Sequence, residues 1–270
     1  MGRIGERFAW LRARREAALV PFVTAGDPDL ETTTELVAAM AQAGAALIEI
    51  GVPFSDPSAD GPTIQRASQR ALARGTTLRR VLEQVEAMRS RVEVPLLLMG
   101  YANPFYAMGP QGFAQAAAQV GVDGVICPDL PPEEGAELYE ALEARGLDGV
   151  LLASPTTSDT RLEKLAKRTR GFLYYVSLTG VTSARERLAE GLEERVRAVK
   201  ARCQVPVCVG FGISRPEQAA QVASFADGAV VGSALVERIE AAADREQAVA
   251  AAAELVGQLK DAMRRGAAGA

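Results

Sequence analysis

Eight short apolar runs alternate with longer amphipathic stretches along this chain. The runs are rich in Val, Ile and Leu and contain few polar residues, which is typical of parallel strands buried on both faces. We therefore expect strands at residues 19–24, 46–52, 94–101, 124–128, 149–153, 171–177, 205–210 and 228–232.

The stretches between the runs show helical periodicity, and several begin with residues that favour helix starts. We expect helices over residues 29–43, 78–89, 133–144 and 216–223. The repetition of strand and helix, eight times over, predicts a single α/β domain folded as a (β/α)8 TIM barrel over residues 1–270. An extra helix is expected at 1–17 and a frayed tail at 264–270. An open doubly wound sheet is the structural alternative.

Two connections are longer than a barrel requires, namely residues 53–76 after the second expected strand and 178–192 after the sixth. In a barrel, the segments that follow strands lie at the face where active sites form. Long loops at that face are more often functional than decorative. We therefore expect the functional site there.

Composition excludes several classes of partner. A net charge of −4 argues against nucleic acid, which attracts basic surfaces. No apolar run reaches the roughly 18 residues that a membrane-spanning helix needs, and no signal-peptide pattern is present. The three cysteines, an odd and sparse set, favour a reducing cytoplasmic location over a disulfide framework.

The absence of histidine excludes a histidine base, a histidine-containing triad and the usual histidine metal sites. The only lysines are Lys164, Lys167, Lys200 and Lys260, all in charged, helix-patterned stretches. None is therefore expected inside a barrel, where it would have to lie to form a Schiff base with a substrate. Proton transfer is left to carboxyl groups, tyrosine, cysteine, water or the substrate.

Glu49 interrupts the second apolar run near its carboxyl end. A carboxylate in a core strand costs several kcal/mol unless it is paired, protonated or open to a polar cavity. One interpretation is a structural ion pair. The other is a general acid–base group whose pKa is raised by apolar surroundings, and the position at a strand end favours this second interpretation.

Asp56 and Asp60 follow on the long second loop. Asp before Pro or Gly commonly forms a turn, and this explanation suits Asp56 well. Asp60 shares that explanation, but its loop lies above the strand that carries Glu49. Two carboxyl groups in different environments can divide acid and charge-stabilising roles.

Glycine-bearing turns follow the last two strands at residues 210–214 and 232–234. Backbone N–H groups of such turns, together with a helix N-terminus, form the common phosphate site of barrels. The alternative is that these glycines only make tight turns. Residues 180–183, in the long sixth loop, have the glycine content of a closing lid.

Aromatic residues at strand ends are candidates for an apolar pocket. Alternation sends one of Tyr174 and Tyr175 into the barrel and the other outward, without indicating which. Phe22 and Tyr101 lie at the ends of the first and third strands, and so does Leu98, for which core packing is the better interpretation.

The segments together resemble the tryptophan synthase α subunit family over essentially the whole chain. The most specific match is LIEIGVPFSDPSADGPTIQ at 47–65, which departs from the family signature at one position. Supporting matches are VPFVTAGD at 20–27, PDLPP at 128–132, YYVSLTGVT at 174–182 and VGFGIS at 209–214.

The resemblance implies a lyase that cleaves indole-3-glycerol phosphate to indole and glyceraldehyde 3-phosphate by a retro-aldol reaction, without metal or organic cofactor. By position, Glu49 matches the acid–base residue, Asp60 the carboxylate that stabilises the positive indole ring, and Tyr174 the active-site tyrosine. The remaining residues that we expect to bind substrate are Phe22, Tyr101, Thr182, Ser183, Phe211, Gly212, Gly232 and Ser233. The family also implies a β-subunit partner in an α2β2 complex.

Three positions depart from the family pattern. Ser58 replaces an aliphatic residue, Ser183 replaces a loop glycine, and Leu178 stands where many relatives carry a polar or basic residue. These departures bear on loop closure and on communication with a partner more than on the reaction. Two other functions stay open: a regulatory partner of the β subunit, and another barrel enzyme that acts on a phosphorylated sugar.

Overall fold

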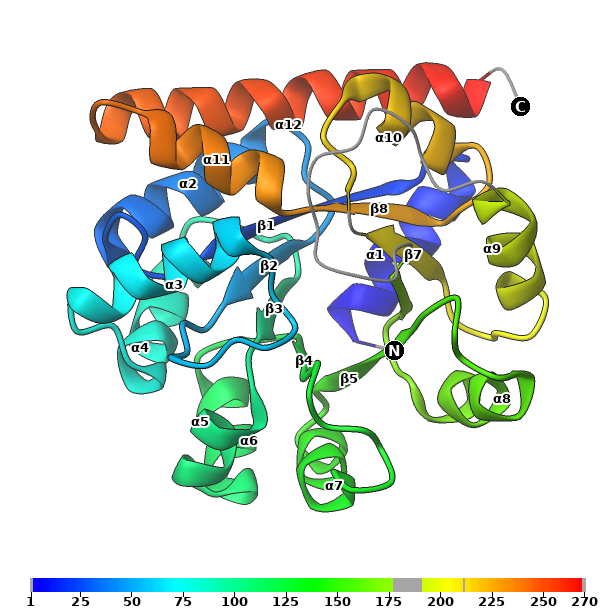
Figure 1. The fold of residues 1–270 in the computed structure, drawn as a ribbon, viewed down its shortest axis with the longest axis horizontal. Coiled ribbons are helices and arrows are strands. Elements are labelled where there is room, and N and C mark those ends of the chain that lie inside the picture. The colour runs from blue at the N-terminus through cyan, green and yellow to red at the C-terminus, as the bar shows by residue number, and fades with distance from the viewer. Residues whose placement is uncertain (1, 177–190, 211, 269–270) are drawn as a thin grey trace.

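The chain folds into a closed barrel of eight parallel strands surrounded by helices (Figure 1). The structure is a computed structural model and describes residues 2–176, 191–210 and 212–268. The strands are β1 (Ala18–Thr24), β2 (Ile48–Gly51), β3 (Leu96–Met99), β4 (Gly124–Ile126), β5 (Asp148–Ala153), β6 (Leu173–Val176), β7 (Val207–Gly210) and β8 (Gly228–Val231). Each overlaps one of the expected runs, so the TIM-barrel prediction is confirmed.

Closure of the barrel is seen in the partners of β1. This strand pairs in parallel with β2, where Phe22 lies opposite Glu49, and also with β8, where Pro21 lies opposite Val231. A sheet whose first and last strands pair has no edge. The open doubly wound alternative is therefore excluded.

Alternation along the strands divides the core into two layers. On β2, Ile48 and Ile50 pack outward against the helices, whereas Glu49 and the preceding residue Leu47 face the barrel interior. The remaining strands follow the same rule, so the interior is filled with side chains. A polar side chain there must lie near the end of a strand to reach solvent or a ligand.

The helices form a ring around the strands (Figure 1). Asp29 and Thr77 cap two of them by accepting hydrogen bonds from backbone N–H groups in the first turn. The ring consists of α2 (Leu30–Gln42), α3 (Pro62–Ala73), α4 (Leu78–Arg89), α5 (Ala102–Met108), α6 (Pro110–Gln119), α7 (Ala136–Ala144), α8 (Asp159–Arg168), α9 (Leu192–Lys200), α10 (Pro216–Ala223), α11 (Ser233–Ala241) and α12 (Arg245–Ala268).

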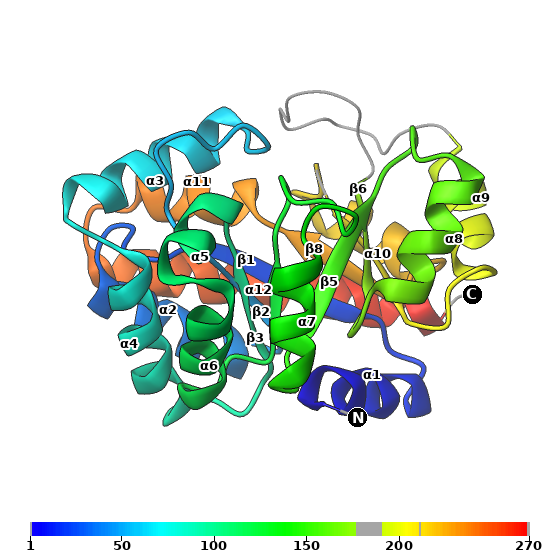
Figure 2. The ribbon, with the colours of Figure 1, turned by 90° about the horizontal axis from the view of Figure 1, so that it is seen from below.

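The expected N-terminal helix is α1 (Arg3–Ala13), shorter than residues 1–17 because Arg15 adopts a positive φ of 55°. Its apolar face buries Ile4, Phe8 and Leu11. Figure 2 shows α1 beneath the barrel, at the end opposite the segment that leads into α3. The helix therefore closes the end of the barrel away from the site.

The frayed tail expected at 264–270 is not observed over most of that range. Instead α12 continues to Ala268, because its last turns remain in contact with the rest of the protein. Met263 is buried, Lys260 Nζ lies 2.6 Å from Glu16 Oε2, and Arg264 Nε lies 3.6 Å from the same oxygen. The long helix packs mainly against α10 and α2.

Candidate active site

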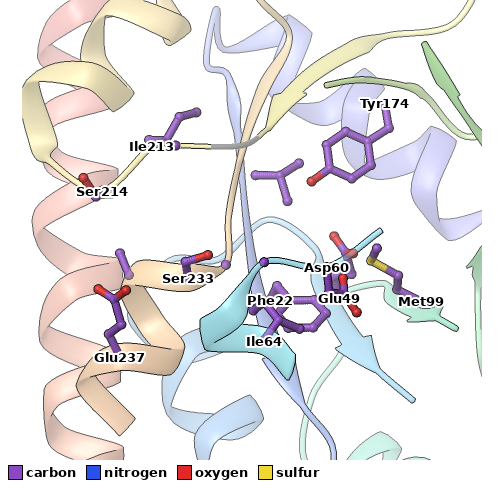
Figure 3. Close-up of a pocket in the computed structure, with 15 residues that line it drawn as sticks. Phe22, Glu49, Asp60, Ile64, Met99, Tyr174, Ile213, Ser214, Ser233 and Glu237 are labelled. Carbon is purple, nitrogen blue, oxygen red and sulfur yellow. The ribbon is translucent and has the colours of Figure 1, made fainter. Parts of the chain in front are cut away.

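A cavity opens at the carboxyl ends of the strands, with about 760 Å³ of empty space that includes open solvent. Seven residues expected from the sequence line it (Figure 3): Phe22, Glu49, Asp60, Tyr174, Gly212, Gly232 and Ser233. They come from five strands or the segments that follow them. The barrel thus gathers residues from distant parts of the sequence at one mouth.

Glu49 reaches the cavity because β2 directs its odd-numbered residues inward. Its side chain is 1% exposed, and its Oε2 has no hydrogen-bond partner among the described residues. Burial, reinforced by the nearby charge of Asp60, raises the pKa of Glu49 to about 8. At neutral pH the group is mainly a neutral acid whose side chain lines the cavity.

Asp60 enters from the loop between β2 and α3. Burial raises its pKa to about 6, and a hydrogen bond from the Tyr101 hydroxyl partly offsets this rise. The two carboxyl groups therefore differ in pKa, as expected for groups with separate acid and charge-stabilising roles. Figure 3 shows them side by side, next to the ring of Phe22.

Tyr101, which we expected to bind substrate, supports the loop beside the cavity. It is absent from the described wall of the cavity, and its hydroxyl accepts a hydrogen bond from the backbone N–H of Ala59 at 3.0 Å. Its ring stacks on Phe54, with centroids 5.3 Å apart. Because Tyr101 lies beyond the end of β3, strand alternation does not determine its direction. It holds the loop that carries Asp60.

Tyr174, not Tyr175, faces the cavity. Tyr175 packs among the helices in the outer core, and Leu98 does the same, as we predicted for Leu98. Glycine makes room for the Tyr174 ring, because a Cβ on Gly210 would lie 2.3 Å from a ring carbon. Burial raises the pKa of Tyr174 well above its ordinary value, so its hydroxyl stays protonated.

The opposite end of the cavity is formed by the two expected glycine turns. Gly212 adopts a positive φ of 84°, which favours glycine. Gly232 precedes α11, whose first turn has no side-chain cap. The leading N–H groups of a helix lack intrahelical partners and attract anions. Backbone groups thus provide a place for a phosphate.

Several lining residues were not anticipated. Met99 and Val230 face inward by strand alternation, while Ile64 lies on α3. Once one residue of β3 and one of β8 are known to face inward, alternation along each strand identifies Met99 and Val230 as inward-facing too. Glu237 on α11 also lines the cavity, and only its helical spacing from Ser233 indicates this.

Four expected positions, Leu178, Thr182, Ser183 and Phe211, lie outside the described residues. The four lysines lie on α8, α9 and α12, as expected, and none lines the cavity. Within the described ranges, no cluster of three or more Cys, Asp or Glu residues has the geometry of a metal site. In the same ranges, no helix is long and apolar enough to cross a membrane.

The fold and the cavity define a class: an α/β-barrel enzyme that combines paired carboxyl groups with a helix N-terminus suited to a phosphate. A family model described as "Tryptophan synthase alpha chain" matches residues 8–264. The tryptophan synthase alpha chain of Citrifermentans bemidjiense is 56% identical over 240 residues, which is 89% of this chain and 90% of the relative.

Solved structures agree with this match. The crystal structure of the tryptophan synthase alpha chain from Legionella pneumophila superposes with a TM-score of 0.90 at 40% identity, covering 98% of each chain. A Mycobacterium tuberculosis tryptophan synthase structure gives 0.88 at 38% identity, covering 97% of this chain and 98% of that one. The chain belongs to the tryptophan synthase alpha chain family. It is a carbon–carbon lyase that cleaves indole-3-glycerol phosphate in tryptophan biosynthesis.

The burial of Glu49 predicts a pH-dependent stability difference between the wild type and Glu49→Gln. The pKa is about 8 in the native state against 4.5 ordinarily, so between these values only the native state keeps the proton. The wild type then loses about 1.4 kcal/mol of unfolding free energy per pH unit because of this group. Glutamine has no proton to lose. The unfolding free energy of E49Q minus that of the wild type should therefore be larger near pH 8 than near pH 5.

Urea unfolding of both proteins at several pH values between these limits measures the difference. A stability difference that does not change with pH would mean that Glu49 ionises in the native state as easily as in the unfolded chain.

Proposed function

We propose that Glu49 is the acid–base group of the cleavage reaction. The observation that carries the proposal is that Glu49 lines the cavity with a buried side chain, whose Oε2 has no hydrogen-bond partner among the described residues. A group that serves both as acid and as base needs a pKa near the working pH, and burial brings the pKa of Glu49 to about 8.

The cleavage then needs one proton carrier. Neutral Glu49 donates its proton to C3 of the indole ring, which gives a positively charged indoleninium ring. The Glu49 carboxylate next accepts the proton of the glycerol hydroxyl adjacent to the breaking bond. The carbon–carbon bond breaks, its electron pair returns to the ring, and indole and glyceraldehyde 3-phosphate form. Glu49 ends protonated, ready for another turnover.

Asp60 and Tyr174 complete the proposed machinery. The Asp60 carboxylate accepts the indole N–H and stabilises the positive ring, because opposite charges attract strongly where water is excluded. Tyr174 offers a protonated hydroxyl that points into the cavity from the wall opposite Phe22 (Figure 3). Phe22 and Ile64 supply apolar surface for the indole.

The phosphate is proposed to bind at the first turn of α11, beside Gly212, Gly232 and Ser233. The support is the start of α11, which has no side-chain cap and whose first residues line the same cavity as Glu49. Contacts from Thr182, Ser183 and Phe211 stay predictions, as does the cytoplasmic location.

A β subunit is the proposed partner, in an α2β2 complex. The support is membership of the family together with solved structures titled as tryptophan synthase from M. tuberculosis. Ser55, Asp56 and Ser58 are exposed on the segment that leads to Asp60. Contact there would act on the position of Asp60 through a few peptide bonds.

Replacing Glu49 with Gln should lower kcat for indole release by about 10²- to 10⁴-fold, the usual contribution of a general acid–base group. Because the shape is kept, the Kd of glycerol 3-phosphate should not change. Steady-state assays and calorimetry measure the two quantities. Near-normal turnover by E49Q would remove Glu49 from the mechanism.

The two carboxyl groups predict a bell-shaped pH profile of kcat/KM. Above about pH 8 the rate should fall because Glu49 loses the proton that it must donate, and below about pH 6 because Asp60 loses its charge. Initial rates at low substrate concentration measure the profile, and circular dichroism at each pH checks that the protein stays folded. Constant kcat/KM from pH 7 to 9 would contradict the proposed acid role.

Adding a tryptophan synthase β subunit should raise the rate of indole formation and shift the sedimentation of the chain to that of a larger complex. Contact near Ser58 would order the segment that carries Asp60. The E49Q chain is the control, since it should join the complex without forming indole. Failure of the wild-type chain to associate would contradict the partnership. Association without any turnover would favour a regulatory function.

A further inference from the structure

The cavity has a third carboxylate, at the end away from Glu49. Glu237 lines the same cavity as Glu49 and Asp60, and its side chain is exposed at the rim. The proposed proton transfers do not use it. Among the described residues that line the cavity there is no lysine or arginine. The charge of Glu237 therefore has no counter-ion in that part of the wall.

Helix geometry directs Glu237 toward the proposed phosphate position. Ser233 begins α11 and Glu237 follows four residues later, so both lie on one face of the helix. Side chains on a helix lean toward its N-terminus. Figure 3 accordingly shows the Glu237 carboxylate pointing back toward the helix start at Ser233. In this position it lies on the same side of α11 as the Ser233 side chain.

The carboxylate is held in this position by α3. The Thr63 hydroxyl donates to Glu237 Oε1 at 3.1 Å. Arg66 is near enough to interact electrostatically with Glu237, but its Nε and Nη2 atoms donate to Glu240 at 3.0 and 2.8 Å. The neighbouring cation is thus engaged by another acid.

We infer that Glu237 is a specificity-determining residue that weakens binding of the phosphate group by like-charge repulsion. The inference rests on the proposed phosphate site at α11. A phosphate held more loosely in substrate and product raises KM and speeds release of glyceraldehyde 3-phosphate. It does not slow the chemistry, because interactions equal in the ground and transition states do not change kcat. Glu237 therefore sets affinity, and Glu49 and Asp60 set the rate.

The test is calorimetric binding of glycerol 3-phosphate to the wild type, E237Q and E237K. At low ionic strength we expect the Kd of E237Q to be about 3- to 10-fold below that of the wild type, and that of E237K to be lower still. The differences should shrink at about 1 M salt, where screening is nearly complete at contact distances. In turnover assays KM should fall in the same order.

Glu246→Gln is the matched control. Glu246 is exposed on α12 and lies outside the cavity wall. Its replacement by Gln changes the net charge by the same amount as E237Q does. The Kd of E246Q for glycerol 3-phosphate should equal that of the wild type. An equal increase in affinity in E246Q and E237Q would overturn the inference. The inference would also be overturned if E237Q bound no more tightly than the wild type, or if the difference between the two did not shrink at high salt. Absence of binding in every variant would reject the phosphate site itself, and the inference with it. Loss of the Glu49 role would leave these binding results intact.

Discussion

The structure depends on one costly arrangement, a carboxyl group buried among the apolar side chains that fill the barrel. Glu49 sits at an inward position of β2, between Leu47 below and the Phe22 ring on the neighbouring strand. Ionising it there costs several kcal/mol, so it stays protonated at neutral pH. The other end of the barrel is closed by α1, which buries Ile4, Phe8 and Leu11 there.

A network of ion pairs links the two ends of the cavity. Arg70 on α3 donates two hydrogen bonds of 2.8 Å to the buried Asp27, which follows β1, and a third to Glu240 on α11. Arg66 also donates to Glu240. The ion pairs tie the helix that follows Asp60 to the helix that starts at the proposed phosphate position. A network of several charges is a stronger argument for stability than an isolated surface pair.

The sequence predicts the fold well because its main signal, buried parallel strands between amphipathic helices, is local. Glu49 is identified for a related reason, since a charge inside an apolar run is conspicuous without any structure, and Asp60 is a candidate because its loop follows the same run. The choice between Tyr174 and Tyr175 needed coordinates, because alternation gives the period of a strand but not its phase. Tyr101 and Glu237 lie beyond the strands, where direction depends on packing between elements. The extent of α12 depends likewise on its contact with Glu16, which is distant in sequence.

Charge in the described cavity wall is one-sided: three carboxyl groups and no lysine or arginine. For a phosphorylated substrate this looks unfavourable, but the proposed reaction builds positive charge on the indole ring. A lysine or arginine near the ring would oppose that charge. It would also lower the pKa of Glu49, since a cation within about 4–6 Å commonly shifts a carboxyl pKa downward by 1 to 3. Binding the phosphate through the backbone of α11, as proposed, would avoid both effects. Helix N–H groups attract the anion at short range without placing a full positive charge in the site. With no lysine or arginine among its described wall residues, the cavity lets Glu49 stay a neutral carboxylic acid, while the proposed phosphate site would use the backbone N–H groups of α11.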